Sequence, residues 1–380
     1  MIKACVIGLG YVGLPILVNL SKKYQCVGYD NNFIRIKELS KGKDFFNEFK
    51  KKTLLDKSIK YTNSLKLIKN FNLFIVTVPT PILKNKTPDL KHLKNVCNNL
   101  SKIIKKKDII IFESTVYPGL TRDYCIPLLE KKNSLKEGFD FFVGYSPERV
   151  NPGDKDHDLK RIDKILAYPY LYRKKELLNL YSLISKKVIF TKNIREAETA
   201  KVIENIQRDV NIGLINEIYL FCEKLNINFN NVIDLASTKW NFLKFNPGLV
   251  GGHCLPVDPY YFSFISKKNS FKTRITLAGR YINDSMEEII RKKIKKKLNS
   301  IDPNNSKKVL ICGLSYKKNV ADLRNSLSLK IFNNLKHKNI KGYDPLLERD
   351  LSKKNRLVTS EKEFFNFDIY IILTKHSILQ

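Results

Sequence analysis

A cysteine in the second half of the chain lies in the run Gly251-Gly252-His253-Cys254-Leu255-Pro256-Val257-Asp258. Two glycines precede the thiol and a carboxylate follows it. A cysteine thiolate is a strong nucleophile and can capture a carbonyl carbon as a covalent adduct. If the protein also holds a hydride acceptor, this cysteine indicates oxidation through a covalent carbonyl adduct.

The chain opens with a pattern typical of dinucleotide binding, Gly8-Leu9-Gly10-Tyr11-Val12-Gly13, directly after the apolar run Ala4-Cys5-Val6-Ile7. The first glycine permits a tight turn, the second lets the backbone approach a pyrophosphate, and the third lets the helix pack closely on the strand. The helix N-terminus then offers N–H groups to the anion. A second apolar run ends at Asp30, whose carboxylate can bond two ribose hydroxyls and would repel a 2′-phosphate. The pattern therefore predicts NAD rather than NADP.

Length and composition limit the number of domains and the location. A chain of 380 residues, 43% of them hydrophobic, is too long for one ordinary core, so two or three domains are expected. The seven cysteines form no CxxC pair and no Cys/His spacing suited to zinc, which argues against a metal site and a disulfide framework. No apolar run has the length of a membrane span, and the glycine-broken N-terminus lacks a signal-cleavage pattern. We expect a cytoplasmic protein without a membrane partner.

The formal net charge of +32 could indicate a nucleic-acid partner. However, the lysines are scattered in small groups over surface-like segments, such as 105–107 and 292–297. A general drift of the composition toward lysine accounts for this better than a nucleic-acid site. We therefore expect no nucleic-acid partner, although a positive field would help to attract an anionic nucleotide substrate.

The first 190 residues alternate expected strands with expected helices. Continuous β-branched or aromatic runs at 73–78, 109–112 and 141–145 predict strands of a parallel sheet covered on both faces. In such a sheet the ligand-facing loops follow the strand C-termini. Pro79-Thr80-Pro81 and Glu113-Ser114-Thr115 follow two of these runs, so both segments are expected beside the cofactor.

From about Arg195 to Leu225 the apolar residues recur near the helical period. A helix of this length could bridge two domains. Helical connectors with so much apolar surface commonly pack against a second copy, so we expect a homodimer.

The last section of the chain repeats the opening pattern. Residues 308–315 echo the first strand and turn, 341–344 echo Val27-Gly28-Tyr29-Asp30, and 367–374 echo 71–78. The second and third glycines of the dinucleotide pattern are absent, so we expect a nucleotide-substrate domain that binds no dinucleotide. The expected fold is α/β, with two Rossmann-like parallel-sheet domains joined by a long central helix.

Four further motifs stand in a fixed order, and with the features above they resemble the UDP-glucose/GDP-mannose dehydrogenase family over the whole chain. More narrowly, the chain resembles the UDP-N-acetylglucosamine (or N-acetylgalactosamine) 6-dehydrogenases of polysaccharide biosynthesis. The motifs are Ser146-Pro147-Glu148-Arg149-Val150-Asn151-Pro152-Gly153-Asp154-Lys155, Glu204-Asn205-Ile206-Gln207-Arg208-Asp209-Val210-Asn211, Thr238-Lys239-Trp240-Asn241-Phe242 and Pro247-Gly248-Leu249-Val250-Gly251-Gly252-His253-Cys254. The resemblance implies an NAD-binding domain at 1–190, a central helical and dimerisation region with the cysteine loop at 191–295, and a UDP-sugar-binding domain at 296–380.

The resemblance also implies an activity, the four-electron oxidation of the sugar C6 alcohol to a carboxylate by two NAD⁺ in succession. The expected substrate is a UDP-N-acetylhexosamine, with UDP-N-acetylglucosamine as first choice and UDP-glucose or UDP-N-acetylmannosamine as alternatives. The residues suit this chemistry, because a thiolate can trap the aldehyde as a thiohemiacetal, which a second oxidation converts to a thioester. A relative that binds nucleotides without turnover, or a simple two-electron dehydrogenase, remains an alternative.

Site residues follow from the same resemblance. Lys201 and Asn205 are four residues apart and so share one helix face, where an ammonium could stabilise an oxyanion and lower the thiol pKa. Asp258 and Lys201 would hold a water. Glu148 would be the base in thioester hydrolysis, and Thr115 would help to orient the water used in that hydrolysis. The catalytic residues expected are Cys254, Lys201, Asp258, Asn205, Glu148 and Thr115. The residues expected to bind the cofactor are Gly8, Gly10, Tyr11, Val12, Gly13, Asp30, Arg35, Pro79, Thr80 and Thr115, and those expected to bind the substrate are Glu148, Arg149, Lys201, Asn205, Gly251 and Arg324.

Several of these residues have a purely structural alternative. Lys201 could be one more solvated lysine, Asp258 could cap the turn before Pro259, and Glu148 could pair with Arg149. The chain also departs from its relatives. Lys318 stands where relatives often carry Glu, Asn246 stands where they often carry Arg, and the chain ends soon after Thr374, so we expect a less completely covered last domain.

Overall fold

The apolar run before the glycine turn forms β1 (Lys3–Ile7) in the computed structural model of the chain. The structure describes residues 1–45, 48–150, 159–347, 356–358 and 361–379, which divide into two units. The first unit comprises residues 1–204 and 260–269, and the second comprises 205–259 and 270–380.

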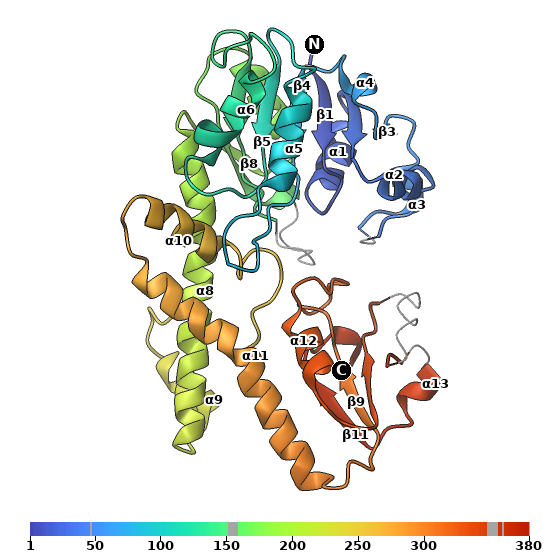
Figure 1. Cartoon of the computed structure of the whole chain (residues 1–380), viewed down its shortest axis with the longest axis vertical. Coiled ribbons are helices and arrows are strands. Elements are labelled where there is room, and N and C mark those ends of the chain that lie inside the picture. The colour runs from blue at the N-terminus through green and yellow to red at the C-terminus, as the bar shows by residue number, and fades with distance from the viewer. Residues whose placement is uncertain (46–47, 151–158, 348–355, 359–360, 380) are drawn as a thin grey trace. The chain divides into compact units, whose positions relative to one another are not determined.

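In the first unit, β1 lies inside an eight-stranded sheet with the order β3-β2-β1-β4-β5-β6-β7-β8 (Figure 1). The other strands are β2 (Gln25–Tyr29), β3 (Tyr61–Thr62), β4 (Leu73–Val76), β5 (Ile109–Phe112), β6 (Phe142–Tyr145), β7 (Asp163–Ala167) and β8 (Lys187–Thr191). The strands from β3 to β6 pair in parallel, which confirms the sheet predicted from the apolar runs. All residues of β4 and β5 are buried, as expected for a sheet covered on both faces.

The sheet departs from the expected parallel pattern at its last two strands. β7 pairs antiparallel with β6 through Tyr145 and Ala167, and β8 runs parallel to β7. A parallel neighbour needs a long crossover, usually a helix. The described residues between β6 and β7, 146–150 and 159–162, contain a single 3-10 turn at Leu159–Arg161.

Seven helices of the described chain precede the long helix below. They are α1 (Gly13–Leu20), α2 (Phe33–Ser40), α3 (Lys51–Leu54), α4 (Leu65–Ile68), α5 (Lys91–Leu100), α6 (Ile126–Glu130), which follows a π-helical turn at Thr121–Cys125, and α7 (Lys174–Tyr181). Buried side chains of α1 and α7, including Leu17 and Leu177, join the sheet residues in one hydrophobic core.

Helix α8 (Ile194–Lys224) continues from the first unit into the second, and its ends lie one residue from those predicted. Helices α9 (Phe229–Ala236), α10 (Asp258–Lys268) and α11 (Arg274–Ile301) follow. In the second unit, a buried ion pair between Arg280 and Asp209 joins α11 to α8, and Asn283 donates to the same carboxylate at 2.9 Å. A buried charge pair of this kind fixes how the two helices pack.

A second parallel sheet, with the order β10-β9-β11, forms the last part of the second unit. Its elements are β9 (Val309–Cys312), α12 (Leu327–Asn334), β10 (Ile340–Tyr343), α13 (Glu361–Phe364) and β11 (Ile369–Ile372), followed by a 3-10 turn at Ser377–Leu379. The predicted echo of the opening residues is confirmed, because β10, β9 and β11 take the places of β2, β1 and β4. Within the described residues, none of the helices has the length and apolar character needed to span a bilayer.

Candidate functional site

The glycine turn between β1 and α1 has the geometry of a dinucleotide cradle. Gly8 has a φ of +95°, which favours glycine, and its N–H donates to the Tyr29 carbonyl at 2.8 Å. A Cβ atom at Gly13 would overlap the Gly8 carbonyl oxygen, so only glycine allows α1 to begin this close to the turn. At Gly10, by contrast, a Cβ would have no atom within 4 Å, so the backbone there is open to a ligand. These features fit a bound pyrophosphate at the N-terminus of α1.

Asp30 follows β2 and lies beside this turn. Its Oδ2 accepts the Leu9 N–H at 2.9 Å and its Oδ1 accepts the Asn32 N–H at 2.9 Å. An ionised carboxylate offers about four acceptor positions, so capacity for ribose hydroxyls remains. Arg35 lies behind the same turn, where its Nε donates to the Leu9 carbonyl at 2.9 Å and its guanidinium pairs with Asp44 at 2.9 Å. These contacts of Arg35 stabilise the turn.

The loops after β4 and β5, which follow strand ends as predicted, contact each other. The Thr80 hydroxyl donates to the Thr115 carbonyl at 2.6 Å, and the Ser114 hydroxyl donates to the Val78 carbonyl at 2.7 Å. Tyr261 of α10, which the sequence did not single out, is fully buried and donates to the Thr80 carbonyl at 2.7 Å. Pro79 lies in the same loop, and Tyr11 and Val12 complete the turn before α1.

Glu148 follows β6 and is buried against a lysine. Its Oε1 accepts the N–H groups of Arg149 and Val150, both at 2.7 Å, and its Oε2 accepts Lys164 Nζ at 3.0 Å. Burial alone would raise the pKa of Glu148, but the Lys164 ammonium and the backbone donors hold it below its usual value. The Arg149 guanidinium pairs instead with Glu204 of α8 at 2.9 Å, so the alternative of a Glu148–Arg149 side-chain pair is wrong. Residues 151–155 of this motif lie outside the described residues.

Lys201 and Asn205 share one face of α8, and both are buried. The alternative that Lys201 is a solvated surface lysine is therefore wrong. Asn205 Nδ2 donates to Asp258 Oδ2 at 2.5 Å, and the Arg208 guanidinium donates to the side-chain oxygen Oδ1 of Asn205 at 3.0 Å. Asp258 is the first residue of α10 and is only 1% exposed. Because it accepts the bond from Asn205, it belongs to the predicted cluster and is more than a turn cap.

Cys254 is exposed, whereas the other six cysteines of the chain are buried. Its carbonyl accepts the N–H groups of Val257 and Asp258, at 3.0 and 2.9 Å, so the thiol lies one turn before α10. Burial raises the pKa of buried thiols such as Cys26, to about 12, and leaves them inert. Cys254 is therefore the one cysteine of the chain that solvent reaches.

A loop between β9 and α12 packs on the cysteine loop within the second unit. Asn325 Nδ2 donates to the Gly252 carbonyl at 3.2 Å, and a Cβ atom at Gly251 would lie only 2.8 Å from the Asn325 carbonyl oxygen. His253 Nε2 lies 3.4 Å from Asp322 Oδ2. Arg324 donates to the same carboxylate at 2.7 Å, and these donors keep the pKa of Asp322 well below its usual value although burial raises it. The structure thus brings Arg324 and Gly251, both predicted to bind substrate, into one contact network.

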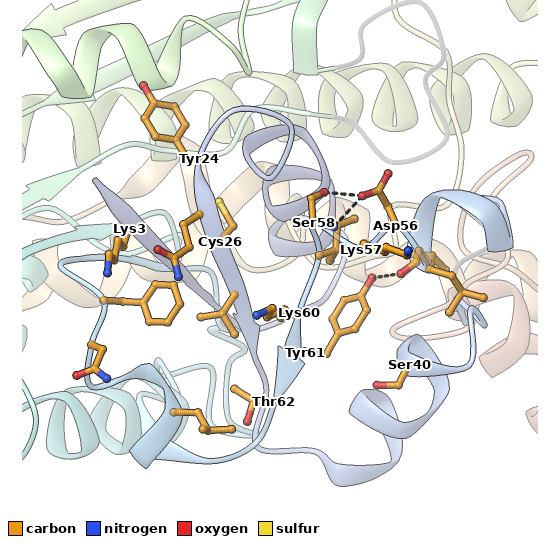
Figure 2. Close-up of a pocket in the computed structure, with 18 residues that line it drawn as sticks. Lys3, Tyr24, Cys26, Ser40, Asp56, Lys57, Ser58, Lys60, Tyr61 and Thr62 are labelled. Atoms are coloured by element: carbon orange, nitrogen blue, oxygen red, sulfur yellow. Dashed lines mark hydrogen bonds between the residues drawn. The ribbon is translucent and has the colours of Figure 1, made fainter. Parts of the chain in front are cut away.

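A hollow of about 930 Å³ lies elsewhere, beside the first residues of β1 and β2 and along β3 (Figure 2). Lys3, Tyr24, Lys60 and Tyr61 are among its lining residues, and none of the predicted site residues lines it. It is therefore separate from the glycine turn, which follows the other end of β1. In the described part of the chain, no group of three or more His, Cys, Asp or Glu side chains is placed to hold a metal ion.

The dinucleotide turn in a largely parallel sheet, the exposed cysteine and the second, parallel sheet fit the class of NAD-dependent dehydrogenases of sugar nucleotides. The chain belongs to the UDP-glucose/GDP-mannose dehydrogenase family. It matches the NAD binding domain of that family at residues 2–182, the central domain at 195–285 and the UDP binding domain at 310–380.

Individual relatives cover nearly the whole chain. It is 41% identical to protein CapL of Staphylococcus aureus over 96% of this chain and 85% of that protein. It is 42% identical to the UDP-N-acetyl-D-glucosamine 6-dehydrogenase of Pseudomonas aeruginosa over 90% of this chain and 83% of that enzyme. The structure of a UDP-D-ManNAc dehydrogenase from Pyrococcus horikoshii superposes with a TM-score of 0.86, at 30% identity, over 99% of this chain and 90% of that one.

Proposed function

We propose that this protein oxidises the C6 alcohol of a UDP-N-acetylhexosamine, with UDP-N-acetylglucosamine as first choice, to the uronic acid for polysaccharide synthesis. The higher identity to the glucosamine enzyme than to the mannosamine enzyme supports that choice. Overall, one R–CH₂OH, two NAD⁺ and one water give R–COO⁻, two NADH and three protons. NAD⁺, held by residues 8–13 and Asp30, supplies the hydride acceptor for each of the two oxidations.

Cys254 carries the covalent part of the reaction. After the first oxidation its thiolate sulfur forms a bond to the aldehyde carbon, and the carbonyl oxygen takes a proton, which gives a thiohemiacetal. The second oxidation removes a hydride from the carbon and a proton from the hydroxyl group of this adduct, two electrons and two protons in all, and leaves a thioester on Cys254. The observation that carries this proposal is the exposure of the Cys254 thiol when the six other thiols of the chain are buried.

The charges that develop during the reaction are stabilised by three residues, Lys201, Asn205 and Asp258. The Lys201 ammonium stabilises the oxyanion that forms when sulfur adds to the carbonyl. Asn205 bonds Asp258 and is itself held by Arg208, which fixes the carboxylate for holding a water. Thr115, whose carbonyl is fixed by Thr80, orients the water used in the last step.

Hydrolysis of the thioester requires a base. Glu148 is ionised at neutral pH because its pKa is lowered, and one of its acceptor positions is left after the three bonds described. It takes a proton from water as the water oxygen bonds the thioester carbon. The carbon–sulfur bond then breaks, and its electron pair stays on Cys254 sulfur.

The test is the stoichiometry of NADH formation. With limiting UDP-N-acetylglucosamine and excess NAD⁺, absorbance should report two NADH for each UDP-sugar consumed, and a parallel panel of the galactosamine, mannosamine and glucose nucleotides ranks the substrates. Cys254→Ser should abolish the four-electron oxidation. One NADH per sugar in the wild-type protein, or full activity in Cys254→Ser, would show a simple two-electron dehydrogenase, and no turnover with any UDP-sugar would refute the proposal.

Assembly and location extend this proposal. The second unit exposes several large apolar side chains on or beside α8, α9 and α11, which support a homodimer. They are Leu214, Phe221, Leu235, Trp240, Ile275 and Tyr281. Light scattering should give twice the 44.2 kDa chain mass, and a monomer at micromolar concentration would refute the dimer.

The free cysteines support a cytoplasmic location, and the family matches support domain limits near 190 and 295.

A further inference from the structure

Lys164 is a buried lysine with two carboxylate partners, and the mechanism above does not use it. Its side chain is 2% exposed, and its Nζ lies 2.7 Å from Glu113 Oε2 and 3.0 Å from Glu148 Oε2. A charged lysine is almost never buried unless it is paired, because removing the ammonium from water is costly. The two ion pairs offset that cost, and one of them involves the base of the proposed hydrolysis.

The reversal of the sheet explains how Lys164 reaches this position. Glu113 and Glu148 follow the parallel strands β5 and β6, at the edge where the strands end. Lys164 is the second residue of β7, so in a fully parallel sheet it would lie at the opposite edge. Because β7 runs antiparallel to β6 and its last residue, Ala167, pairs with Tyr145 at the end of β6, the earlier residues of β7 extend beyond the end of β6. Lys164 therefore lies beside the segment that follows β6 and meets both carboxylates.

Glu113 is the second carboxylate partner of Lys164. Its Oε1 accepts the Tyr181 hydroxyl of α7 at 2.8 Å, and the side chains of Glu113 and Tyr181 are fully enclosed. Burial alone would lower the pKa of Lys164, but the two carboxylates raise it, so the lysine stays protonated. Burial and the charge of Glu148 raise the pKa of Glu113. Glu148, with a side chain 9% exposed, is the one carboxylate of this pair that solvent reaches.

We propose that Lys164 is a positioning residue that keeps Glu148 ionised and correctly oriented for thioester hydrolysis, while Glu113 and Tyr181 hold Lys164 in place. This inference rests on the proposed function. In the step concerned, one water proton passes to Glu148 and the water oxygen bonds the carbonyl carbon. The carbon–sulfur bond breaks toward sulfur, the second water proton passes to the Cys254 thiolate, and Glu148 then releases its proton to solvent.

The test is Lys164→Met in the full-length protein, followed by stopped-flow absorbance of NADH. Without the ammonium, two buried carboxylates face each other and the Glu148 pKa rises. We expect a burst of two NADH per active site and then a steady rate reduced roughly 100-fold or more, the usual contribution of a general base. The acidic limb of the kcat profile should move to higher pH. A steady rate and pH profile like those of the wild-type protein would overturn the inference.

Two further variants separate positioning from folding. Glu113→Gln keeps the Lys164–Glu148 pair and removes only the second carboxylate, so its steady rate should lie clearly above that of Lys164→Met. The double variant Lys164→Met/Glu113→Gln removes one charge of each sign and leaves no second carboxylate, which protects the fold if the single lysine variant is unstable. It should still show the burst and the slow steady rate, and a wild-type rate in it would also overturn the inference. If the wild-type protein itself forms no NADH, the proposed function fails instead.

Discussion

Strands β1 and β9 each lie between two parallel partners, β2 and β4 beside β1 and β10 and β11 beside β9. The backbone bonds after the two strands match. The N–H groups of Gly8 and Gly313 donate to the carbonyls of Tyr29 and Tyr343, both at 2.8 Å. The next N–H donates to an aspartate in each case, Leu9 to Asp30 at 2.9 Å and Leu314 to Asp344 at 2.8 Å.

The two turns diverge at the third residue. Gly10 leaves open space beside the backbone, whereas the equivalent Ser315 is fully buried and donates its hydroxyl to Asp344 Oδ2 at 2.7 Å. That oxygen also accepts the N–H groups of Leu314 and Ser315 and lies 3.2 Å from His376 Nε2. The hydrogen bonds that this oxygen can accept are therefore made within the protein, whereas Asp30 can still accept hydrogen bonds from a ligand.

The segment after the turn differs as well. Helix α1 begins at Gly13, directly after the first turn, but α12 begins only at Leu327. The longer segment of residues 313–326 includes Asn325, which bonds the cysteine loop at Gly252. The same strand order therefore makes a cofactor cradle where glycine and a carboxylate with spare acceptor positions follow the strand. In the second unit a serine fills that space, and the segment after the turn packs on the cysteine loop.

The largest effect is expected from Gly13→Ala. The added methyl group would overlap the Gly8 carbonyl oxygen, so α1 must shift away from the turn. Overpacking of this kind costs about 1–3 kcal/mol, and we expect at least that loss of unfolding free energy together with a loss of NAD binding of tenfold or more. Chemical denaturation and calorimetric titration with NAD⁺ measure the two effects. Unchanged NAD affinity would mean that the turn does not bind the cofactor.

Asp344→Asn tests the second turn. The amide nitrogen would leave several buried donors without an acceptor, which costs about 1–3 kcal/mol of stability, while NAD affinity should stay unchanged. Burial raises the pKa of Asp344, but His376, Ser315 and the Leu346 N–H hold it below its usual value. The ionised carboxyl therefore stabilises the fold above about pH 4 and loses this contribution as the pH falls through the lowered pKa. Acid unfolding of the variant should show less of this dependence, and an equal pH slope would contradict the assignment.

Gly10→Ala separates ligand contact from folding. The methyl group meets no protein atom within 4 Å, so the melting temperature should not change. NAD affinity should fall about tenfold, or roughly 1.4 kcal/mol, because the backbone at this position must approach the pyrophosphate. Ser315→Gly is the matched variant in the second turn, and calorimetry should still find one NAD site per chain. A second NAD site in Ser315→Gly would contradict the difference in cofactor binding between the two turns.

The smallest effect is expected from Asn325→Gly. Asn325 has a φ of +52°, which glycine tolerates, so the substitution removes the side-chain bond to Gly252 without straining the backbone. One hydrogen bond contributes about 1 kcal/mol, and we expect the rate of NADH formation to fall a few-fold with NAD affinity unchanged. A fall in NAD affinity instead would show that the second turn does not act through the cysteine loop.

The sequence predicted features that local patterns encode. The strand before Gly8, the aspartate after β2 and the long helix α8 all follow from apolar periodicity and glycine spacing, and each is present in the structure. Lys164 could not be found this way, because it is one of 69 lysines and arginines. Its role depends on the antiparallel return of β7, which apolar runs do not specify. Tyr261 was missed for a similar reason, since its contact with Thr80 joins residues far apart in the chain.

The most direct test of the account is mass spectrometry of the Glu148→Gln variant, quenched during reaction with UDP-N-acetylglucosamine and NAD⁺. Because hydrolysis is slowed in this variant, the peptide that contains Cys254 should carry the mass of the oxidised sugar nucleotide. The same peptide from Glu148→Gln/Cys254→Ser should carry no added mass. Accumulation of the uronic acid product while the Cys254 peptide never gains mass would contradict the covalent route.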